Sequence, residues 1–186
     1  KKLPLGVRRE IELRDMLPIV LEPPEITADT GIVIYSHDPE LRNTILEDNM
    51  CFFASQGFIC TALRPGAGTA EYRKLAVYAA SHFPNREIYV VGTGFSGARL
   101  AVGVLSSGVN VQEVTLLNTE YEDLLASLEE ERIPMRSRDN ITVFMDSQVA
   151  ETPKNRYGIE VKSFNRKPEF GNEWFNALAM GLADDD

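Results

Sequence analysis

Residues 88–105, IYVVGTGFSGARLAVGVL, decide the fold of this chain. They join a short apolar run rich in β-branched residues, a turn with three glycines, and a run of small and apolar residues at helical spacing. This pattern predicts a buried strand, a tight turn and a closely packed helix. Because ligands in α/β proteins bind beyond the carboxyl ends of the strands, this turn is the first candidate site.

On both sides of this stretch the sequence predicts alternating strands and helices. The remaining strands are expected at 31–35, 58–63, 114–117, 141–145 and 159–164, and the helices at 38–57, 69–83, from 119 and from 172. Such alternation predicts an α/β fold, a three-layer sandwich with a mainly parallel sheet and helices on both faces. Residues 7–22 predict an antiparallel hairpin at the sheet edge. Thr119-Glu120-Tyr121-Glu122 matches a capping box.

The length of 186 residues suits one domain, with an N-terminal arm and edge hairpin over 1–29, the α/β domain over 30–183 and an acidic tail over 184–186. A net charge of −9 opposes nucleic-acid binding. No apolar run approaches the ~18 residues of a membrane span. The compartment stays open between the cytoplasm and, for a chain trimmed before Lys1, the periplasm or the exterior.

Two cysteines, Cys51 and Cys60, have no histidine nearby and do not form a Cys-x-x-Cys pair. A zinc site is therefore not expected. Free buried thiols and a disulfide are the two alternatives for this pair.

The first interpretation of the glycines is a dinucleotide site, since Gly92-x-Gly94-x-x-Gly97 satisfies the local fingerprint. That fingerprint requires an acid at the end of the next strand for the ribose hydroxyl, where this chain has Asn118. The fingerprint also normally belongs to the first strand of its domain, and here two strand–helix units precede it. NAD or FAD binding is therefore kept only as an alternative, and no cofactor is expected.

The second interpretation uses the whole order of elements. A strand ending in Tyr35-Ser36-His37, the segment 53–64 and the strand–turn–helix that opens this section follow one another in an order that resembles the α/β-hydrolase family. That family carries its nucleophile in an elbow, G-x-S-x-G. In this chain Gly92 matches the first glycine, but Gly94 stands in place of the serine. The resemblance implies a hydrolase fold without its nucleophile.

The base of the family's catalytic triad is also missing. It follows the last strand, where this chain has Asn165, and the two histidines are His37 and His82. Asparagine cannot act as a general base, and His82 is expected at a helix C-terminus, where it suits the helix dipole. Asp146 follows its strand about where the family's acid occurs, but there is no late histidine for it to orient.

Ser96 is the remaining serine of the turn. It is expected in the first turn of the helix, where its hydroxyl caps the helix rather than acting as a nucleophile. A left-handed φ at Gly94 would support the hydrolase interpretation. A turn that aims several N–H groups into an open groove would instead support phosphate binding.

These residues predict a catalytically inactive α/β-hydrolase-like domain that acts as a binding, scaffold or regulatory module. No catalytic residue and no metal ligand is assigned, and the expected partner is a protein or a small apolar ligand. The residues expected to line the vestigial cleft are His37, Thr93, Gly94, Phe95, Ser96, Asp146 and Asn165. An active serine-type esterase or hydrolase that uses Ser36 or Ser96 with His37 is the main alternative, and the dinucleotide domain is the other.

Overall fold

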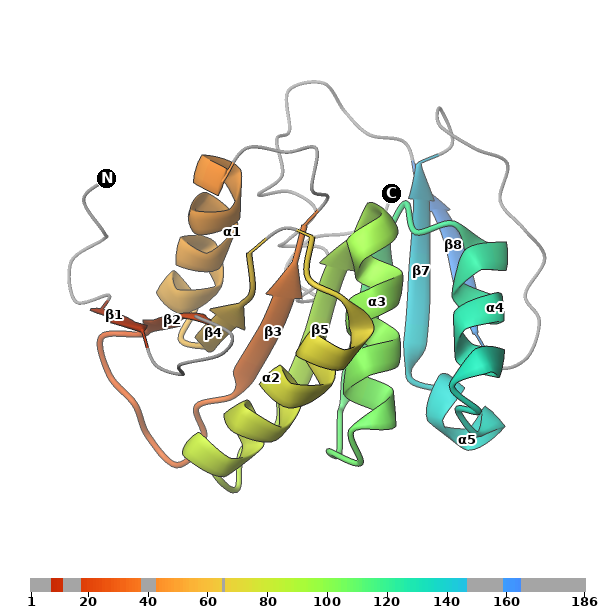
Figure 1. The fold of residues 1–186 in the computed structure, drawn as a ribbon. Helices are drawn as coiled ribbons and strands as arrows, with labels where there is room; N and C mark the ends of the chain where they lie inside the picture. Colours follow the sequence, from red (N-terminus) through yellow and green to blue (C-terminus); the bar gives the residue numbers. More distant parts are fainter. Residues whose placement is uncertain (1–7, 12–17, 38–42, 65, 147–158, 165–186) are drawn as a thin grey trace.

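The computed structural model describes residues 8–11, 18–37, 43–64, 66–146 and 159–164, which form one sheet with helices on both faces (Figure 1). The strands are β1 (Arg8–Ile11), β2 (Ile19–Glu22), β3 (Ile32–Ser36), β4 (Ile59–Ala62), β5 (Ile88–Thr93), β6 (Glu113–Leu117), β7 (Ile141–Asp146) and β8 (Glu160–Phe164). The helices are α1 (Asn43–Ser55), α2 (Thr69–His82), α3 (Gly94–Ser106), α4 (Tyr121–Glu130) and α5 (Met135–Arg138). The predicted alternation of strands and helices is confirmed.

The strands form a sheet of eight in the order β1-β2-β4-β3-β5-β6-β7-β8. Neighbours from β4 to β8 are parallel, whereas β2 is antiparallel to both β1 and β4. The predicted edge hairpin is thus confirmed and is continuous with the main sheet. Because parallel strands end at the same edge, the carboxyl ends of β3, β5 and β6 are neighbours, and the turn after β5 lies between the other two.

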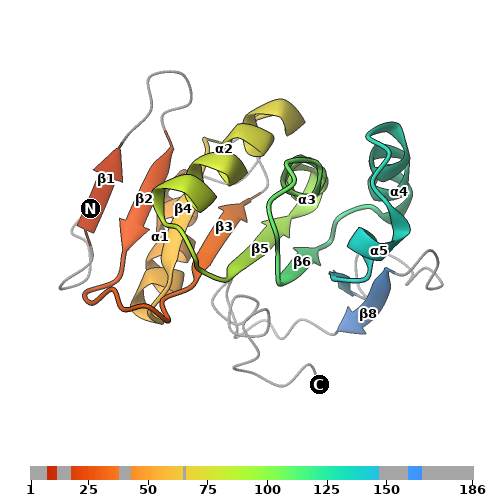
Figure 2. The same cartoon turned by 90° about the horizontal axis from the view of Figure 1, so that it is seen from below.

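Two apolar layers hold the helices to the sheet. One layer lies between the sheet and α2, α3 and α4, and it includes Leu75, Leu100 and Leu124. The other lies under α1, with Leu46, Met50 and Phe53. Figure 2 shows α1 on the face opposite to α2, α3 and α4. Burial on both faces explains why every residue of β3 is buried, as its continuous apolar run predicts.

Two predictions about where elements begin or end need correction. β5 continues to Thr93, beyond the apolar run at 88–91, and α3 then begins at Gly94, so that Ser96 lies in its first turn as expected. The capping box at 119–122 is wrong, because the N-cap of α4 is Glu120 and no side chain caps it. The Thr119 hydroxyl donates instead to the carbonyl oxygen of Gly94, a competing acceptor from another helix.

Two other expectations fall outside the described residues: the start of the helix expected over 38–57 and the helix expected from residue 172. Both cysteines are free thiols, Cys60 buried and Cys51 half-buried, so the disulfide alternative is not realised. Burial raises the pKa of the Cys60 thiol well above its usual range.

Among the described helices, none is both long and apolar enough to cross a membrane.

Candidate functional site

The turn between β5 and α3 bends sharply at Gly94, whose φ is +58°. This left-handed conformation costs an L-residue with a side chain roughly 1–2 kcal/mol, but glycine adopts it freely. The observation expected for a hydrolase-type elbow is therefore present. We refer to residues 92–97 as the elbow.

The other two glycines of the elbow let β5 and α3 approach closely. A Cβ atom placed on Gly92 would lie 2.8 Å from the Cα of Gly97, and one placed on Gly97 would lie 2.7 Å from Oγ1 of Thr119. Both distances are shorter than real side chains tolerate. Packing and one left-handed residue thus account for the glycine triplet, and neither role requires a phosphate.

Ser96 points into the protein. Its side chain is buried, and its Oγ lies 2.6 Å from the carbonyl oxygen of His37 and 3.0 Å from that of Thr93. The expectation that it caps α3 is wrong in its detail, because the hydroxyl binds carbonyl oxygens instead of the free N–H groups of the first turn. The reason is position: the N-cap is Thr93, and Ser96 faces the end of β3.

Ser96 belongs to a small buried hydroxyl cluster with Ser36 and Tyr72. The two serine Oγ atoms are 3.3 Å apart, and Ser36 forms a hydrogen bond with Tyr72. Burial raises the pKa of Tyr72 to about 12, an effect that the Ser36 hydrogen bond partly opposes. The hydroxyl cluster therefore ties β3, α2 and α3 together beneath the elbow.

The raised pKa of Tyr72 makes stability depend on alkaline pH. The folded protein holds Tyr72 neutral, whereas the unfolded chain ionises it near pH 10, so this stabilisation is complete below pH 10 and declines as pH rises toward 12. Between pH 10 and 12 the ionisation of Tyr72 lowers the free energy of unfolding of the wild type. We expect the free energy of unfolding of Tyr72→Phe to fall by up to about 2 kcal/mol less over the same range. Urea denaturation of the wild type and of Tyr72→Phe from pH 8 to 11.5 measures this difference in the free energy of unfolding. Tyr35 retains a similar dependence, because burial also raises its pKa.

Tyr89→Phe is the matched control, because Tyr89 is only half-buried. Its pKa is raised mainly by a hydrogen bond with Glu87. We expect this variant to retain most of the alkaline loss seen in the wild type. An alkaline profile of Tyr72→Phe identical to that of the wild type would contradict the assignment.

The structure brings five of the seven expected site residues to one place. Thr93, Gly94, Phe95 and Ser96 form the elbow, and His37 contacts it through its backbone carbonyl. The His37 ring is buried and stacks on Tyr35 at 6.4 Å between centroids. Asp146 ends β7, two strands away from β5. Asn165 lies outside the described residues.

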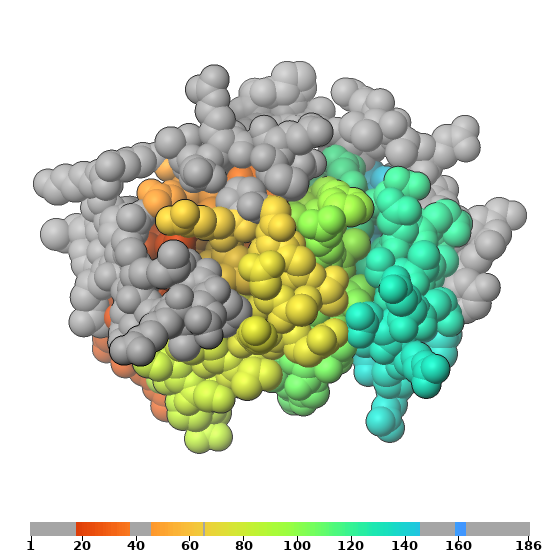
Figure 3. Space-filling view, in the orientation of Figure 1, coloured from red at the N-terminus to blue at the C-terminus, as the bar shows by residue number. Residues whose placement is uncertain are grey.

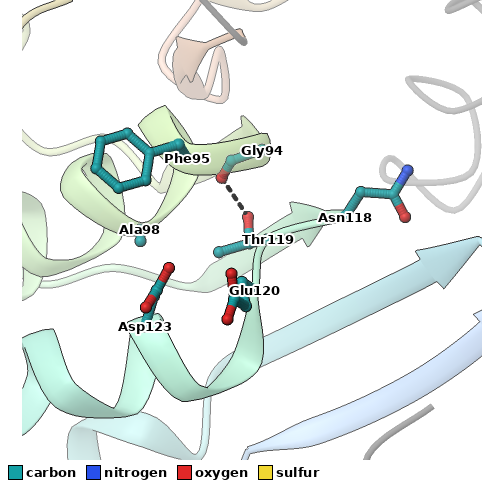
Figure 4. A pocket seen from close by; sticks show the side chains of 7 residues that line it. All are labelled: Gly94, Phe95, Ala98, Asn118, Thr119, Glu120 and Asp123. Atoms are coloured by element: carbon teal, nitrogen blue, oxygen red, sulfur yellow. Dashed lines mark hydrogen bonds between the residues drawn. The ribbon is translucent and has the colours of Figure 1, made fainter. Parts of the chain in front are cut away.

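A hollow of about 190 Å³ opens beside the elbow (Figure 4). It is lined by Gly94, Phe95, Ala98, Asn118, Thr119, Glu120 and Asp123. One wall belongs to the start of α3, and the other to the turn between β6 and α4 together with the first turn of α4. On the face shown in Figure 3, α2, α3 and α4 lie side by side. Typical ligand pockets measure ~300–1,000 Å³, so this hollow suits one group of a larger ligand.

The chemistry of the hollow is mixed. Phe95 is 54% exposed, unusual for a large apolar side chain, and the guanidinium carbon of Arg99 lies 4.3 Å from its ring centroid. Glu120 and Asp123 place two carboxylates on the opposite wall. The sequence pattern marks Asn118 only as a strand end, and it assigns Thr119 to a capping box. Their place just after β6, the neighbour of β5, is the signal that could have identified this wall.

A mainly parallel sheet with a left-handed elbow at the end of an inner strand, followed directly by a helix, is the arrangement of an α/β-hydrolase. This chain therefore has the α/β-hydrolase fold, as its element order predicted.

Comparison with solved structures agrees. A predicted CIB-like hydrolase from Thermoplasma acidophilum superimposes with a TM-score of 0.60 at 10% identity, over 95% of this chain and 97% of the other. An S-formylglutathione hydrolase from Agrobacterium tumefaciens gives 0.59 at 10% identity, over 97% and 95%. An acylaminoacyl peptidase gives 0.57 at 10% identity, but this chain spans only 41% of its length. The sequence matches no family model and no curated protein. At such identities the likeness concerns the fold.

Proposed function

We propose that this protein is a non-hydrolytic α/β-hydrolase-fold domain that binds a ligand or partner at the elbow. The observation that carries the proposal is Gly94, which stands with φ +58° at the turn where the fold places its nucleophile. The chain keeps the backbone conformation of the elbow, but Gly94 has no reactive side chain at that position. The hollow beside it supplies the surface for binding.

The neighbouring side chains support the same proposal. An attacking serine needs a hydroxyl that reaches the substrate and a base that takes its proton. The Ser96 hydroxyl is buried, and its shortest contact is with the His37 carbonyl oxygen, which cannot accept the proton in a reaction. The structural relatives described above are hydrolases by name, so this chain would use their fold without their reaction.

A specific observation favours the second candidate, an active hydrolase with unconventional residues. Ser36, Ser96 and His37 are neighbours beneath the elbow, with 3.3 Å between the serine hydroxyl oxygens. Such an enzyme would need the buried hydroxyl cluster to open before either serine could reach a substrate. The buried positions of both serines argue against it.

Exposure to a fluorophosphonate separates the two candidates. We expect no gain in intact mass for the wild type, because neither Ser36 nor Ser96 is accessible. We expect ethyl butyrate, followed by NMR, to remain unhydrolysed while the amide signals of Gly94, Phe95 and Thr119 shift with its concentration. Labelling or turnover that is lost in Ser96→Ala or Ser36→Ala would establish the active hydrolase instead.

A gain of reactivity provides the complementary test. We expect fluorophosphonate labelling only when Gly94→Ser and Asn165→His are combined, which supplies a nucleophile at the elbow and a histidine at the position that the family resemblance indicates. Each single variant serves as a control for the double variant. Labelling of either single variant at the rate of the double variant would show that an existing residue already acts as the base.

A further inference from the structure

We infer that the side-chain ring of Phe95 is the contact surface for an uncharged aromatic group of the ligand, and that Arg99 is the positioning residue that holds this ring beside the hollow. This inference rests on the proposed binding function and adds the class of ligand group. It concerns the solvent-exposed side of α3, not the buried hydroxyl cluster beneath the elbow.

Phe95 presents apolar surface beside the hollow. Among the described residues, the exposed large apolar side chains are Val77, Phe95 and Met135, and Phe95 is the most exposed at 54%. Of these three, Phe95 is the one that lines the hollow (Figure 4). A ligand group that covers the ring removes this apolar surface from water, which is favourable. The ring is therefore the part of the hollow best suited to bind an apolar group.

Arg99 fixes the place of this ring. It lies four positions after Phe95 on α3, and residues at this spacing are neighbours on a helix surface. Helical side chains point back toward the N-terminus, which lets the long Arg99 side chain reach the ring. Its guanidinium carbon lies over the ring, 4.3 Å from the centroid, the geometry of a cation–π contact. Because Arg99 does not itself line the hollow, this contact leaves the rest of the ring surface to the ligand.

The space beside the ring has the size of one aromatic group. The hollow measures about 190 Å³, and ~150 Å³ is enough for a benzene molecule in an apolar cavity. Ala98, on the same wall, has a side chain too short to fill this space (Figure 4). Two aromatic rings in contact attract each other beyond the burial of their surfaces, in stacked or edge-to-face arrangements. An aromatic group is thus preferred over an aliphatic group of similar size.

The charges around the hollow favour an uncharged group. Glu120 and Asp123 contribute two carboxylates, which disfavour an anion. They are offset by the Arg99 guanidinium on the Phe95 ring and by the N-termini of α3 and α4, each worth roughly half a positive charge. A second cation on the ring would also be repelled by Arg99. A charged group therefore gains little attraction to offset the loss of its hydration, whereas an uncharged ring loses none.

Four probes test the ligand class, each titrated into labelled protein while the amide signals of Gly94, Phe95 and Thr119 are followed. Benzyl alcohol carries the uncharged aromatic group, and cyclohexylmethanol has a similar size without an aromatic ring. Benzoate and benzylammonium add a negative and a positive charge. We expect benzyl alcohol to bind about 5-fold more tightly than cyclohexylmethanol, and more tightly than either ion.

Two pairs of variants test the residues. Phe95→Leu keeps an apolar side chain without the ring, and we expect it to lose the preference for benzyl alcohol over cyclohexylmethanol. Phe52→Leu is the matched control, because Phe52 is half-buried on α1, on the opposite face of the sheet, and this variant should keep the preference. Arg99→Met keeps the long side chain but removes its charge, and we expect about 3-fold weaker binding of benzyl alcohol. Arg99→Lys should restore the affinity of the wild type.

The methyl signal of Ala98 tests the role of Arg99 without a ligand. Ala98 and Phe95 line the same hollow, and a ring that changes its position alters the chemical shift of a nearby methyl group. We expect this signal to move in Arg99→Met, to return in Arg99→Lys and to stay in place in Phe52→Leu. An unmoved Ala98 signal together with unchanged affinity in Arg99→Met would overturn the positioning role.

The probes also separate this inference from the proposed function. Equal affinity for benzyl alcohol and cyclohexylmethanol, with ethyl butyrate still bound, would overturn the aromatic class and leave the proposed function standing. Tighter binding of benzoate or benzylammonium than of benzyl alcohol would show that the group is charged. If no probe moves the elbow amide signals, ethyl butyrate included, the ligand class and the proposed binding function are both contradicted.

Discussion

Gly103→Val is expected to lower the free energy of unfolding by more than about 3 kcal/mol. A Cβ atom at Gly103 would lie 2.6 Å from the carbonyl oxygen of Thr69 and 2.8 Å from the Cβ of Tyr72. These atoms belong to α2, whose backbone packs directly against α3, so no flexible side chain can move aside. The two helices must separate and lose part of the apolar layer beneath them. Urea denaturation at neutral pH gives the difference.

Gly68→Ala is the control for this prediction. A Cβ atom at Gly68 would meet only the end of the Glu71 side chain, at 3.9 Å. We expect its effect to stay within about 1 kcal/mol, the size of an N-cap change. Equal free energies of unfolding for Gly103→Val and Gly68→Ala would show that α2 and α3 do not cross as closely as described.

Leu116→Ala is expected to cost about 2–5 kcal/mol and also to loosen the elbow. Leu116 is fully buried in β6, and its Cδ2 lies 3.3 Å from where a Cβ atom on Gly92 would stand and 3.4 Å from the equivalent atom on Gly97. It therefore fills the space directly under the turn. Truncating this side chain leaves a cavity there, so both stability and the amide signals of Gly94 and Phe95 should change.

Leu128→Ala separates the two effects of that change. Leu128 is equally buried but lies on α4, outside the elbow. We expect a comparable loss of unfolding free energy, with the Gly94 and Phe95 amide signals unmoved. Elbow signals that respond to both variants alike would mean that they report general stability rather than the support given by Leu116.

Much of the fold followed from local patterns. The apolar run at 31–35 predicts a strand buried on both faces, and the observed β3, Ile32–Ser36, is such a strand. The helix predicted at 69–83 is observed as Thr69–His82. Patterns of this kind record which face of an element is buried, and burial of apolar surface is the main driving force of folding. The fold class could therefore be predicted before any contact was known.

The site was predictable only in part. The elbow and the glycine at position 94 were evident because they are contiguous in sequence, and the identity of a residue in a turn is a local fact. Thr119 was misassigned, because its neighbourhood matches a capping box and its true acceptor, the Gly94 carbonyl, is 25 positions away. A hydroxyl chooses among the acceptors that the fold brings near it, and a local motif contains only one set of them.

The sequence alone determined that a strand, a glycine turn and a helix follow one another at residues 88–105, and that the turn carries no nucleophile at Gly94. Only the tertiary structure decided what each glycine does, how Ser96 is turned inward onto the His37 carbonyl, and which residues of the next turn form the second wall of the hollow. The reason is physical: backbone conformation and burial depend on neighbours along the chain, whereas hydrogen-bond partners and close approaches depend on neighbours in space.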